Sequence, residues 1–185
     1  MQYTGKNMNV PRTARLNFRL MDEQDAPLLY ELDNDPQVMQ YLTRGKVSSM
    51  QTIQEVFIPR MQAYRNTEKG WGLWQVNITQ TNEFIGWVLI RPMDFFTKSP
   101  NYNDIEIGWR FKRSSWGKGF ASEAATAIAD CIAQQPQVHA ISATALQDNL
   151  ASIKVMEKLA MKFIKNYTHI DDEGELPAVL YRKLV

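Results

Sequence analysis

A glycine-containing turn before an apolar helical stripe could bind an anion. Gly117 and Gly119 flank Lys118, and the stripe begins at Ala121. Glycine adopts backbone angles closed to other residues and leaves no side chain in front of its amide. Several N–H groups can therefore converge on one anion at the positive end of a helix dipole. We interpret the segment from Trp116 to Ala121 as a phosphate cradle, with an ordinary tight turn as the alternative.

The spacing around this turn differs from two common nucleotide motifs. A P-loop needs a glycine and a Ser/Thr where Lys112 and Gly119 stand. A Rossmann turn needs a third glycine where Ser122 stands, and residues 139–143 supply no acid for a ribose. The pattern therefore indicates a phosphate ligand other than ATP or NAD.

Glu106 is a candidate proton acceptor on the strand that precedes the turn. Residues 104–111 alternate between apolar and polar or small residues, the period of a strand with one buried face. Glu106 lies on the polar face, where a carboxylate could accept a proton from an amine directly or through a water. The alternative is a structural glutamate held in a salt bridge, and the residues alone favour it.

The elements that position these groups follow the order β-α-α-β-β-β-α-β-α-β-β. Helices are predicted after Asp22 or Asp25, from Ser48 or Ser49, from Ala121, and over 149–159, with Pro59 bending or breaking the second. Strands are predicted over 15–20, 71–78, 84–91, 104–111, 139–145, 161–170 and 176–185, with a loop over 93–102 and a turn over 171–174. This order predicts an α/β domain with a mixed sheet of about seven strands flanked by about four helices.

Bulk composition predicts one domain. The chain has 185 residues, 44% of them hydrophobic, which suits one full core. We expect a loose tail over residues 1–12 and one domain over 13–185. A net charge of +1 gives no strongly basic footprint for nucleic acid. The polar start and the lack of a long apolar run predict a cytoplasmic protein that does not bind membranes.

The metal-binding and redox residues are few and scattered. The single cysteine, Cys131, lies near the apolar helical stripe and is expected to be a buried structural thiol. His139 and His169 have no cysteine or paired histidine beside them. No metal site is predicted.

The ordered motifs together resemble the GNAT superfamily of acetyl-CoA-dependent N-acetyltransferases, and most closely its ribosomal-protein N-terminal (Rim-type) branch. The resemblance runs from about Thr13 to the C-terminus and implies the single-domain GNAT-like fold. The matching segments are Glu106–Trp109, Trp116–Ala124, Asn149–Ser152 and Met156–Phe163, with an opening that includes Arg15-Leu16, Arg19-Leu20, Asp35-Pro36 and Tyr41-Leu42.

The resemblance implies acetyl-CoA as cosubstrate and assigns residues to it. The pyrophosphate would bind at Trp116, Gly117, Lys118, Gly119, Phe120 and Ala121. The pantetheine arm would pair with the backbone of Ile107 and Trp109, beside the room left by Gly108, and Asn149 would contact CoA unless it is an ordinary helix cap. Lys112 and Arg113, at the end of the strand, could neutralise phosphate or simply be solvated.

The resemblance also implies catalytic and acceptor-site residues. It reverses the preference at Glu106 in favour of a general base, and it places Ser152 near the thioester sulfur, where a hydroxyl could donate to the leaving thiolate. Tyr41, Leu42 and Arg44 would belong to a wall of the acceptor site, with simple packing or surface charge as the alternative.

Three positions depart from the superfamily pattern. Met156 stands where many members have a tyrosine that acts as general acid, so that role would fall to Ser152, to water or to nothing. Ser114 replaces a common Gln or Arg, and Ala160 replaces a common glycine.

The sequence therefore predicts transfer of acetyl to a primary amine, with a protein N-terminus, such as that of a ribosomal protein, as the favoured acceptor. A small amine (a polyamine, amino acid or antibiotic) and a non-catalytic CoA-binding module are the alternatives. A monomer and a homodimer are both open.

Overall fold

A seven-stranded sheet runs through the computed structural model, which describes residues 7–171 and 174–185. Its strand order is β1-β2-β3-β4-β5-β7-β6, and β4 and β5 are the parallel pair among antiparallel neighbours. The strands are β1 Leu16–Leu20, β2 Gly72–Ile78, β3 Phe84–Met93, β4 Asn101–Phe111, β5 Ala140–Leu146, β6 Lys162–Asp171 and β7 Gly174–Leu184. The predicted α/β class and mixed sheet are confirmed.

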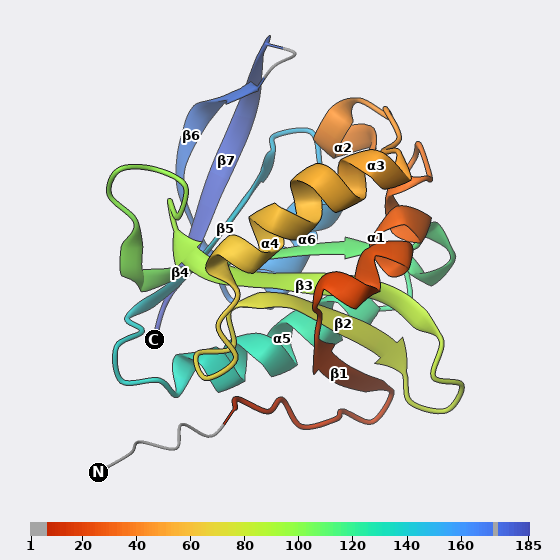
Figure 1. Cartoon of the computed structure of the whole chain (residues 1–185). Coiled ribbons are helices and arrows are strands. Elements are labelled where there is room, and N and C mark those ends of the chain that lie inside the picture. Colours follow the sequence, from red (N-terminus) through yellow and green to blue (C-terminus); the bar gives the residue numbers. More distant parts are fainter. Residues whose placement is uncertain (1–6, 172–173) are drawn as a thin grey trace.

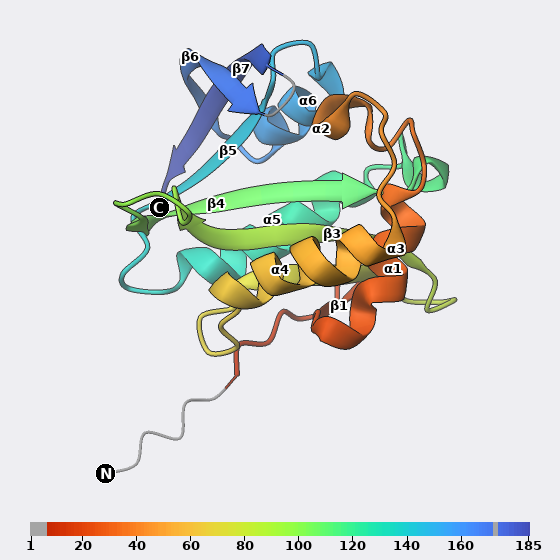
Figure 2. The same ribbon diagram turned by 45° about the horizontal axis from the view of Figure 1, so that its top comes forward.

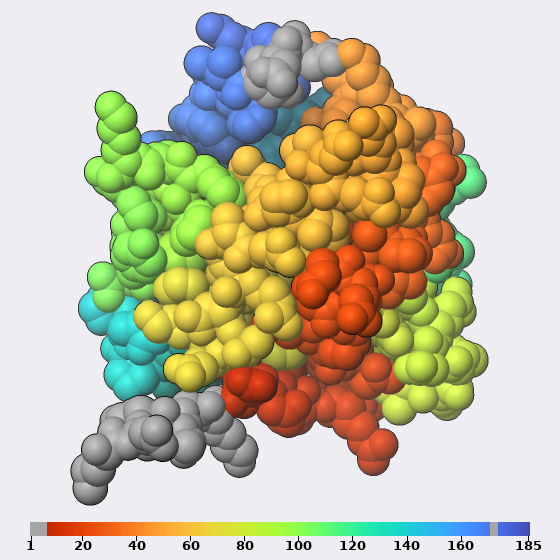
Figure 3. All heavy atoms as spheres, viewed as in Figure 1, coloured from red at the N-terminus to blue at the C-terminus, as the bar shows by residue number. Residues whose placement is uncertain are grey.

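Helices cover both faces of this sheet (Figure 1). They are α1 Ala26–Asp33, α2 Gln40–Thr43, α3 Met50–Thr52, α4 Ile58–Tyr64, α5 Phe120–Ala133 and α6 Leu150–Lys158, and short 3₁₀ turns lie at Glu23–Asp25 and Arg113–Ser115. The order of elements matches the predicted one apart from α2, whose four residues are too few to show an apolar period. In the space-filling view, the yellow and orange helices fill the face toward the viewer below the blue C-terminal strands (Figure 3).

Side-chain caps start the helices at predicted positions. Asp22 forms a capping box with Asp25 at the turn that leads into α1, and the Ser49 hydroxyl accepts a hydrogen bond from the Thr52 N–H. Asn149 caps α6 by accepting from the Ser152 N–H at 3.2 Å. Each cap satisfies a backbone donor that the first helical turn leaves free.

Of the bend or break predicted at Pro59, the break is wrong. The chain stays helical from α3 through a π-helical segment, Ile53–Phe57, into α4. The Ile58 N–H donates to the Ile53 carbonyl, five residues back. Because proline has no N–H to donate, a local shift to longer-range bonding lets the helix pass it without an interruption.

Two apolar layers hold the helices against the sheet. On one face, α5 packs through a fully buried stripe of small and branched residues, Ala124, Ala125, Ile128 and Ile132. On the other face, residues of α1 and α4 pack against Leu73, Phe84 and Trp87 of the sheet. The sheet is therefore covered on both sides, and access to its middle depends on gaps between strands.

Such a gap opens between β4 and β5. The two strands pair at only three positions, which end at Glu106 opposite Ser142. Beyond that point β4 continues to Phe111 and β5 continues to Leu146, and the two strands no longer pair with each other. Figure 2 shows the two strands close at one end and diverging toward α2 and α6.

The N-terminal segment is partly packed. Among described residues, 7–12 form no helix or strand, yet Val10 is buried and the Met8 N–H donates to the Thr67 carbonyl at 2.8 Å. The loose tail predicted for residues 1–12 is therefore wrong for this part, because Met8 and Val10 join the core on the α5 face. Residues 1–6, and positions 172 and 173 of the predicted turn, lie outside the described residues.

Candidate active site

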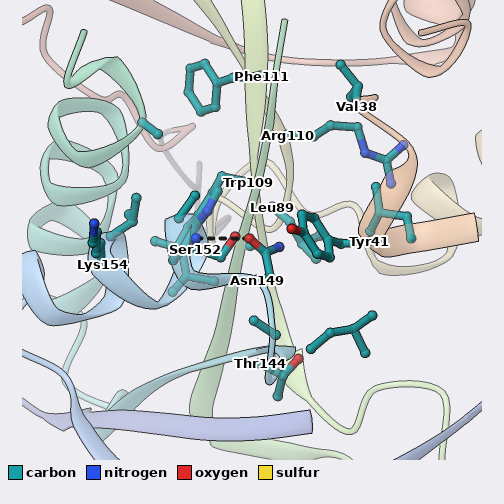
Figure 4. Close-up of a pocket in the computed structure, with 18 of the residues that line it drawn as sticks. Val38, Tyr41, Leu89, Trp109, Arg110, Phe111, Thr144, Asn149, Ser152 and Lys154 are labelled. Atoms are coloured by element: carbon teal, nitrogen blue, oxygen red, sulfur yellow. Dashed lines mark hydrogen bonds between the residues drawn. The ribbon is translucent and has the colours of Figure 1, made fainter. Parts of the chain in front are cut away.

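A pocket of about 620 Å³ occupies the gap between β4 and β5. Its lining comes from both diverging strands, from the turn before α5, from α6, from α2 and from the C-terminal hairpin. In Figure 4, Ser152 lies on one side of the central strand, Tyr41 and Val38 lie on the other, and Asn149 lies between them. The pocket thus connects the α5 face of the sheet to the α1–α4 face.

On the α5 face, the glycine turn is shaped as the sequence predicts. Gly117 and Gly119 have φ values of 72° and 78°, in the left-handed region that favours glycine, and both line the pocket. Gly119 is the N-cap of α5 and makes no side-chain cap hydrogen bond. A Cβ on Gly117 would meet nothing within 4 Å. The turn therefore leaves open space in front of the first amides of an α-helix.

A side-chain clamp fixes this turn to the start of the domain. The Arg15 guanidinium pairs with Glu123 of α5, with Nε to Oε2 at 2.7 Å, and its Nη1 donates to the Lys118 carbonyl at 3.0 Å. Arg15 also lies over the Phe120 ring at 4.5 Å. Burial raises the pKa of Glu123, but hydrogen bonds from Thr13 and Arg15 outweigh it and leave the pKa lowered. Glu123 therefore stays ionised and holds Arg15 against the turn.

Along the edge of β4, backbone groups border the pocket where β5 has turned away. Ile107, Gly108 and Trp109 all line the pocket and lie beyond the last β4–β5 pair. A strand edge without a partner offers N–H and C=O groups to an extended ligand. Gly108, flanked by Leu89 on the neighbouring strand, adds no side chain of its own.

The positive charges near the turn differ from those predicted. Lys112 pairs with Glu31 at 2.6 Å and Arg113 with Asp35 at 3.4 Å, so both side chains are directed to the α1 side. The Lys118 ammonium donates to the Ser114 carbonyl at 2.8 Å, and its side chain does not line the pocket.

Two lysines that sequence reasoning missed line the pocket instead. Lys154 and Lys158 lie four residues apart on α6, and neither has an ion-pair partner among the described residues. Side chains at this spacing share one helix face. The four-residue spacing of these lysines, shortly after Asn149, is the sequence feature that could have indicated them.

On α6, the polar residues nearest the gap are Asn149 and Ser152. Both line the pocket, and Asn149 is also the helix cap that formed the alternative interpretation (Figure 4). Met156, at the position of the usual tyrosine, is buried in the core with 1% of its surface exposed. Met156 therefore cannot supply a proton to a leaving thiolate.

On the α1–α4 face, β3 and β4 present three cross-strand pairs in a row. Arg91 lies opposite Glu106, Leu89 opposite Gly108, and Trp87 opposite Arg110. Arg91 Nε donates to Glu106 Oε2 at 2.7 Å, and these side chains are 18% and 15% exposed. The salt bridge considered as the alternative for Glu106 is therefore present. Glu106 also lines the pocket, and its Oε1 makes no hydrogen bond to a described residue.

Arg110 forms the far end of this row. Its Nη1 donates to the buried Asp33 carboxylate of α1, and its guanidinium lies 4.9 Å from the Trp87 ring centre. Tyr41 and Leu42, on α2, also line the pocket. Arg44, the C-cap of α2, is not among the lining residues.

The C-terminal hairpin adds pocket residues that no sequence motif indicated. Tyr167 and His169 of β6 line the pocket together with Thr144 of β5. Burial raises the pKa of Tyr167, the hydrogen bond with Thr144 lowers it, and the charge of Glu106 raises it again. Behind Glu106, burial raises the pKa of Tyr64 to about 12. Both phenols therefore stay protonated near neutral pH.

These groups fit acetyl-CoA. The glycine turn with Lys154 and Lys158 would hold phosphates, and the free edge of β4 would hold the pantetheine arm. Bound there, acetyl-CoA supplies an activated acyl group as a thioester. The chain itself would orient the acceptor, accept the ammonium proton at Glu106 Oε1 and place a hydroxyl donor, Ser152, at the gap.

Comparison with known proteins identifies the family. Residues 15–162 match the acetyltransferase (GNAT) domain, so the chain belongs to the GNAT family of acetyl-CoA-dependent N-acetyltransferases. It is 35% identical over 156 residues to the uncharacterized protein YkkB of Bacillus subtilis, covering 83% of this chain and 85% of that protein. The uncharacterized N-acetyltransferase YnaD of the same species is 30% identical, covering 81% of each chain.

Solved structures share the fold. A GNAT-family acetyltransferase from Bacillus anthracis has a TM-score of 0.76 at 25% identity, covering 96% of this chain and 98% of that one. RimL, a ribosomal α-N-protein acetyltransferase solved with coenzyme A, has a TM-score of 0.76 at 18% identity with the same coverage. Spermidine N-acetyltransferase from Vibrio cholerae, solved with CoA and spermine, has a TM-score of 0.72 at 16% identity, covering 93% and 96%. The Rim-type branch is thus one of several with this fold.

Residues 7–171 and 174–185 show no features of a metal site or a membrane-spanning helix. No group of three or more His, Cys, Asp or Glu side chains in these ranges could hold a metal ion. In the same ranges, no helix is both long and apolar enough to cross a bilayer. Burial and the neighbouring Asp130 raise the pKa of the partly buried Cys131, which keeps it a thiol.

Proposed function

We propose that this N-acetyltransferase acetylates the N-terminal α-amine of a protein, such as a ribosomal protein. The observation that carries the proposal is the charge of the pocket. Glu106 is the one carboxylate among the described lining residues, and it already pairs with Arg91. Polyamines and aminoglycosides carry several positive charges, and binding them would require several carboxylates. A pocket with one carboxylate is suited to an acceptor with one positively charged amine, such as a protein N-terminus.

The shape and chemistry of the acceptor side also suit an extended chain. Tyr41, Leu42, Leu89 and Trp87 form an apolar and aromatic wall along the row of cross-strand pairs. Such walls bind peptide side chains by burial, while polar groups set their orientation. Leu42 is 47% exposed, so this wall reaches the protein surface, where the end of another protein can enter.

In this proposal Glu106 is the general base and Arg91 fixes its position. The ion pair through Oε2 holds the carboxylate in one orientation, and Oε1 is left to accept a proton from the ammonium group of the acceptor. Ser152 supplies a hydroxyl donor for the departing thiolate. The predicted cytoplasmic location and the monomeric or homodimeric state stay predictions.

The test is release of free CoA with a panel of acceptors. Trialanine amide, spermidine, kanamycin and free alanine would each be supplied with acetyl-CoA, with Glu106→Gln as the matched inactive control. The expected result is the highest kcat/KM for the peptide. A preference for spermidine or kanamycin would assign the protein to small amines. Acetyl-CoA binding without turnover of any acceptor would indicate a non-catalytic CoA-binding module.

A further inference from the structure

The side-on edge of the Arg110 guanidinium is an unused hydrogen-bonding fork. Asp33 takes Nη1, whereas Nε is shut off from solvent without a partner and Nη2 makes no hydrogen bond to a described residue. Nε–H and one Nη2–H point in the same direction, the geometry with which arginine binds a carboxylate or carbonyl bidentately. A buried donor left unpaired is costly, so a partner at this edge would be favoured.

The position of this fork is set rigidly. Asp33 is 2% exposed and holds the guanidinium from the α1 side, and the Trp87 ring supports it at 4.9 Å. Arg110 and Trp87 are also direct cross-strand partners. The Trp87 indole N–H is a second buried donor that has no partner among residues 7–171 and 174–185. Two unpaired donors, both on residues that line the pocket, therefore lie side by side.

The distance from Glu106 indicates what could fill this place. Four residues of strand at roughly 3.4 Å each put the Cα atoms of Glu106 and Arg110 about 14 Å apart on the same face. Gly108 and Leu89 form the floor between them. A free amino acid is too short to reach both ends, whereas an extended peptide of two or three residues spans this length.

We propose that Arg110, supported by Trp87, binds an oxygen of the acceptor chain about two residues beyond the amine that is acetylated. The oxygen is a main-chain carbonyl or a side-chain carboxylate, both of which accept from the fork. This subsite rests on the proposed function, because it takes the amine to lie at Glu106. It makes Arg110 a specificity-determining residue that distinguishes peptides from amines without oxygen.

Arg110→Lys tests the subsite. Lysine keeps the charge beside Asp33 but loses the planar fork. Steady-state kinetics would compare trialanine amide, Ala-Asp-Ala amide and the oxygen-free hexylamine. We expect KM to rise about 10- to 100-fold for peptides, as for loss of a hydrogen bond to a charged group. KM for hexylamine and acetyl-CoA should stay unchanged. An effect on Ala-Asp-Ala amide alone would assign the oxygen to the carboxylate, and an equal effect on both peptides would assign it to the carbonyl.

Two controls keep the result interpretable. Asp33→Asn with Arg110→Met removes the buried pair without leaving an isolated charge, and should show the same rise in peptide KM if Arg110→Lys fails to fold. Arg12→Lys, on an exposed residue outside the pocket, is the matched arginine control. Unchanged peptide KM in both Arg110 variants would overturn the proposed subsite and leave the proposed function standing.

The proposed function can fail separately. If the wild-type enzyme acetylates hexylamine or spermidine but no peptide, the proposed acceptor is wrong and the subsite falls with it. If no acceptor is acetylated, calorimetry of trialanine amide on the CoA complex still tests Arg110. Weaker peptide binding in Arg110→Lys would then support the subsite, and equal binding would contradict it.

Discussion

On the α5 side of the pocket, the groups available to a ligand are backbone amides and lysines that have no ion-pair partner in the described part of the chain. On the α1–α4 side they are side chains that already hold partners. Gly117, Gly119, Lys154 and Lys158 represent the first kind. The pairs Glu106–Arg91 and Arg110–Asp33 represent the second.

The difference follows from what each side would bind. Phosphates carry charge in many directions, so flexible lysines and amides at a helix end are enough to hold them. An amine that must meet a thioester needs a carboxylate in one orientation, and an ion pair at 2.7 Å supplies it. Changes on the first side should alter affinity for acetyl-CoA, and changes on the second should alter turnover or acceptor affinity.

The largest effect is expected for Glu106→Gln. Glutamine keeps the shape but cannot accept a proton, so kcat should fall by roughly 10²- to 10⁴-fold while acetyl-CoA affinity changes little. The measurement is the rate against pH under conditions where chemistry limits, and the acidic limb should disappear.

Glu31→Gln is the matched control, because it removes the ion pair with Lys112 outside the pocket. It should leave the rate and the acidic limb as they are. An acidic limb that survives in Glu106→Gln would mean that the proton leaves by another route.

The same comparison explains which parts of the site could be predicted from sequence. The glycine turn, the alternating strand and the Asn149 cap are local, since each depends on residues close together in the chain. Their backbone geometry is therefore determined by the local sequence. The fold followed from the same local periods, apart from α2 and the π-helical passage around Pro59.

The acceptor side could not be predicted in this way. Its ion pair between Arg110 and Asp33 joins residues 77 positions apart. Tyr167 comes close enough to Glu106 for the carboxylate to raise its pKa only because the C-terminal hairpin lies beside the pocket. Because Lys112 and Arg113 are near the turn in sequence, phosphate and solvent were the two partners that the sequence suggested for them. Acids on α1 and just after it draw them away. Which charged side chains pair with each other depends on tertiary contacts, and the local periodicity of the sequence does not predict these contacts.

A large effect on affinity is expected for Gly117→Val. A β-branched residue resists a φ of 72° and its side chain would occupy the open space in front of the turn. Loss of one or two amide hydrogen bonds to phosphate predicts acetyl-CoA binding about 10- to 100-fold weaker by calorimetry.

Gly45→Val separates strain from ligand contact, since Gly45 has a φ of 81° and does not line the pocket. It should lower the melting temperature as Gly117→Val does, yet keep its affinity for acetyl-CoA. Equal affinity in a folded Gly117→Val would contradict the anion site.

A smaller effect is expected for Ser152→Ala. The hydroxyl is a neutral donor beside a leaving group that water can also reach, so kcat should fall by roughly 2- to 10-fold. The pH profile should keep its acidic limb, in contrast to Glu106→Gln. Ser114→Ala, outside the pocket lining, is the control. A loss in Ser152→Ala as large as that in Glu106→Gln would give the serine an essential role in proton transfer.

The smallest effects, and the sharpest test of the difference between the two sides, are expected for Lys154→Ala and Lys158→Ala. Both lysines are exposed, so their attraction for phosphate is weakened by solvent and by salt. Each change should raise KM for acetyl-CoA by roughly 2- to 5-fold at low ionic strength, and the increase should shrink as salt is added. Lys165→Ala, exposed on β6 outside the pocket, should leave KM for acetyl-CoA unchanged.

The acceptor side should depend less on salt, because Glu106 and Arg91 are mostly buried and their charges are screened much less. KM for the acceptor should therefore depend less on salt than KM for acetyl-CoA in the wild-type enzyme. Equal salt dependence for both substrates, or no change in either lysine variant, would show that these lysines do not hold the phosphates.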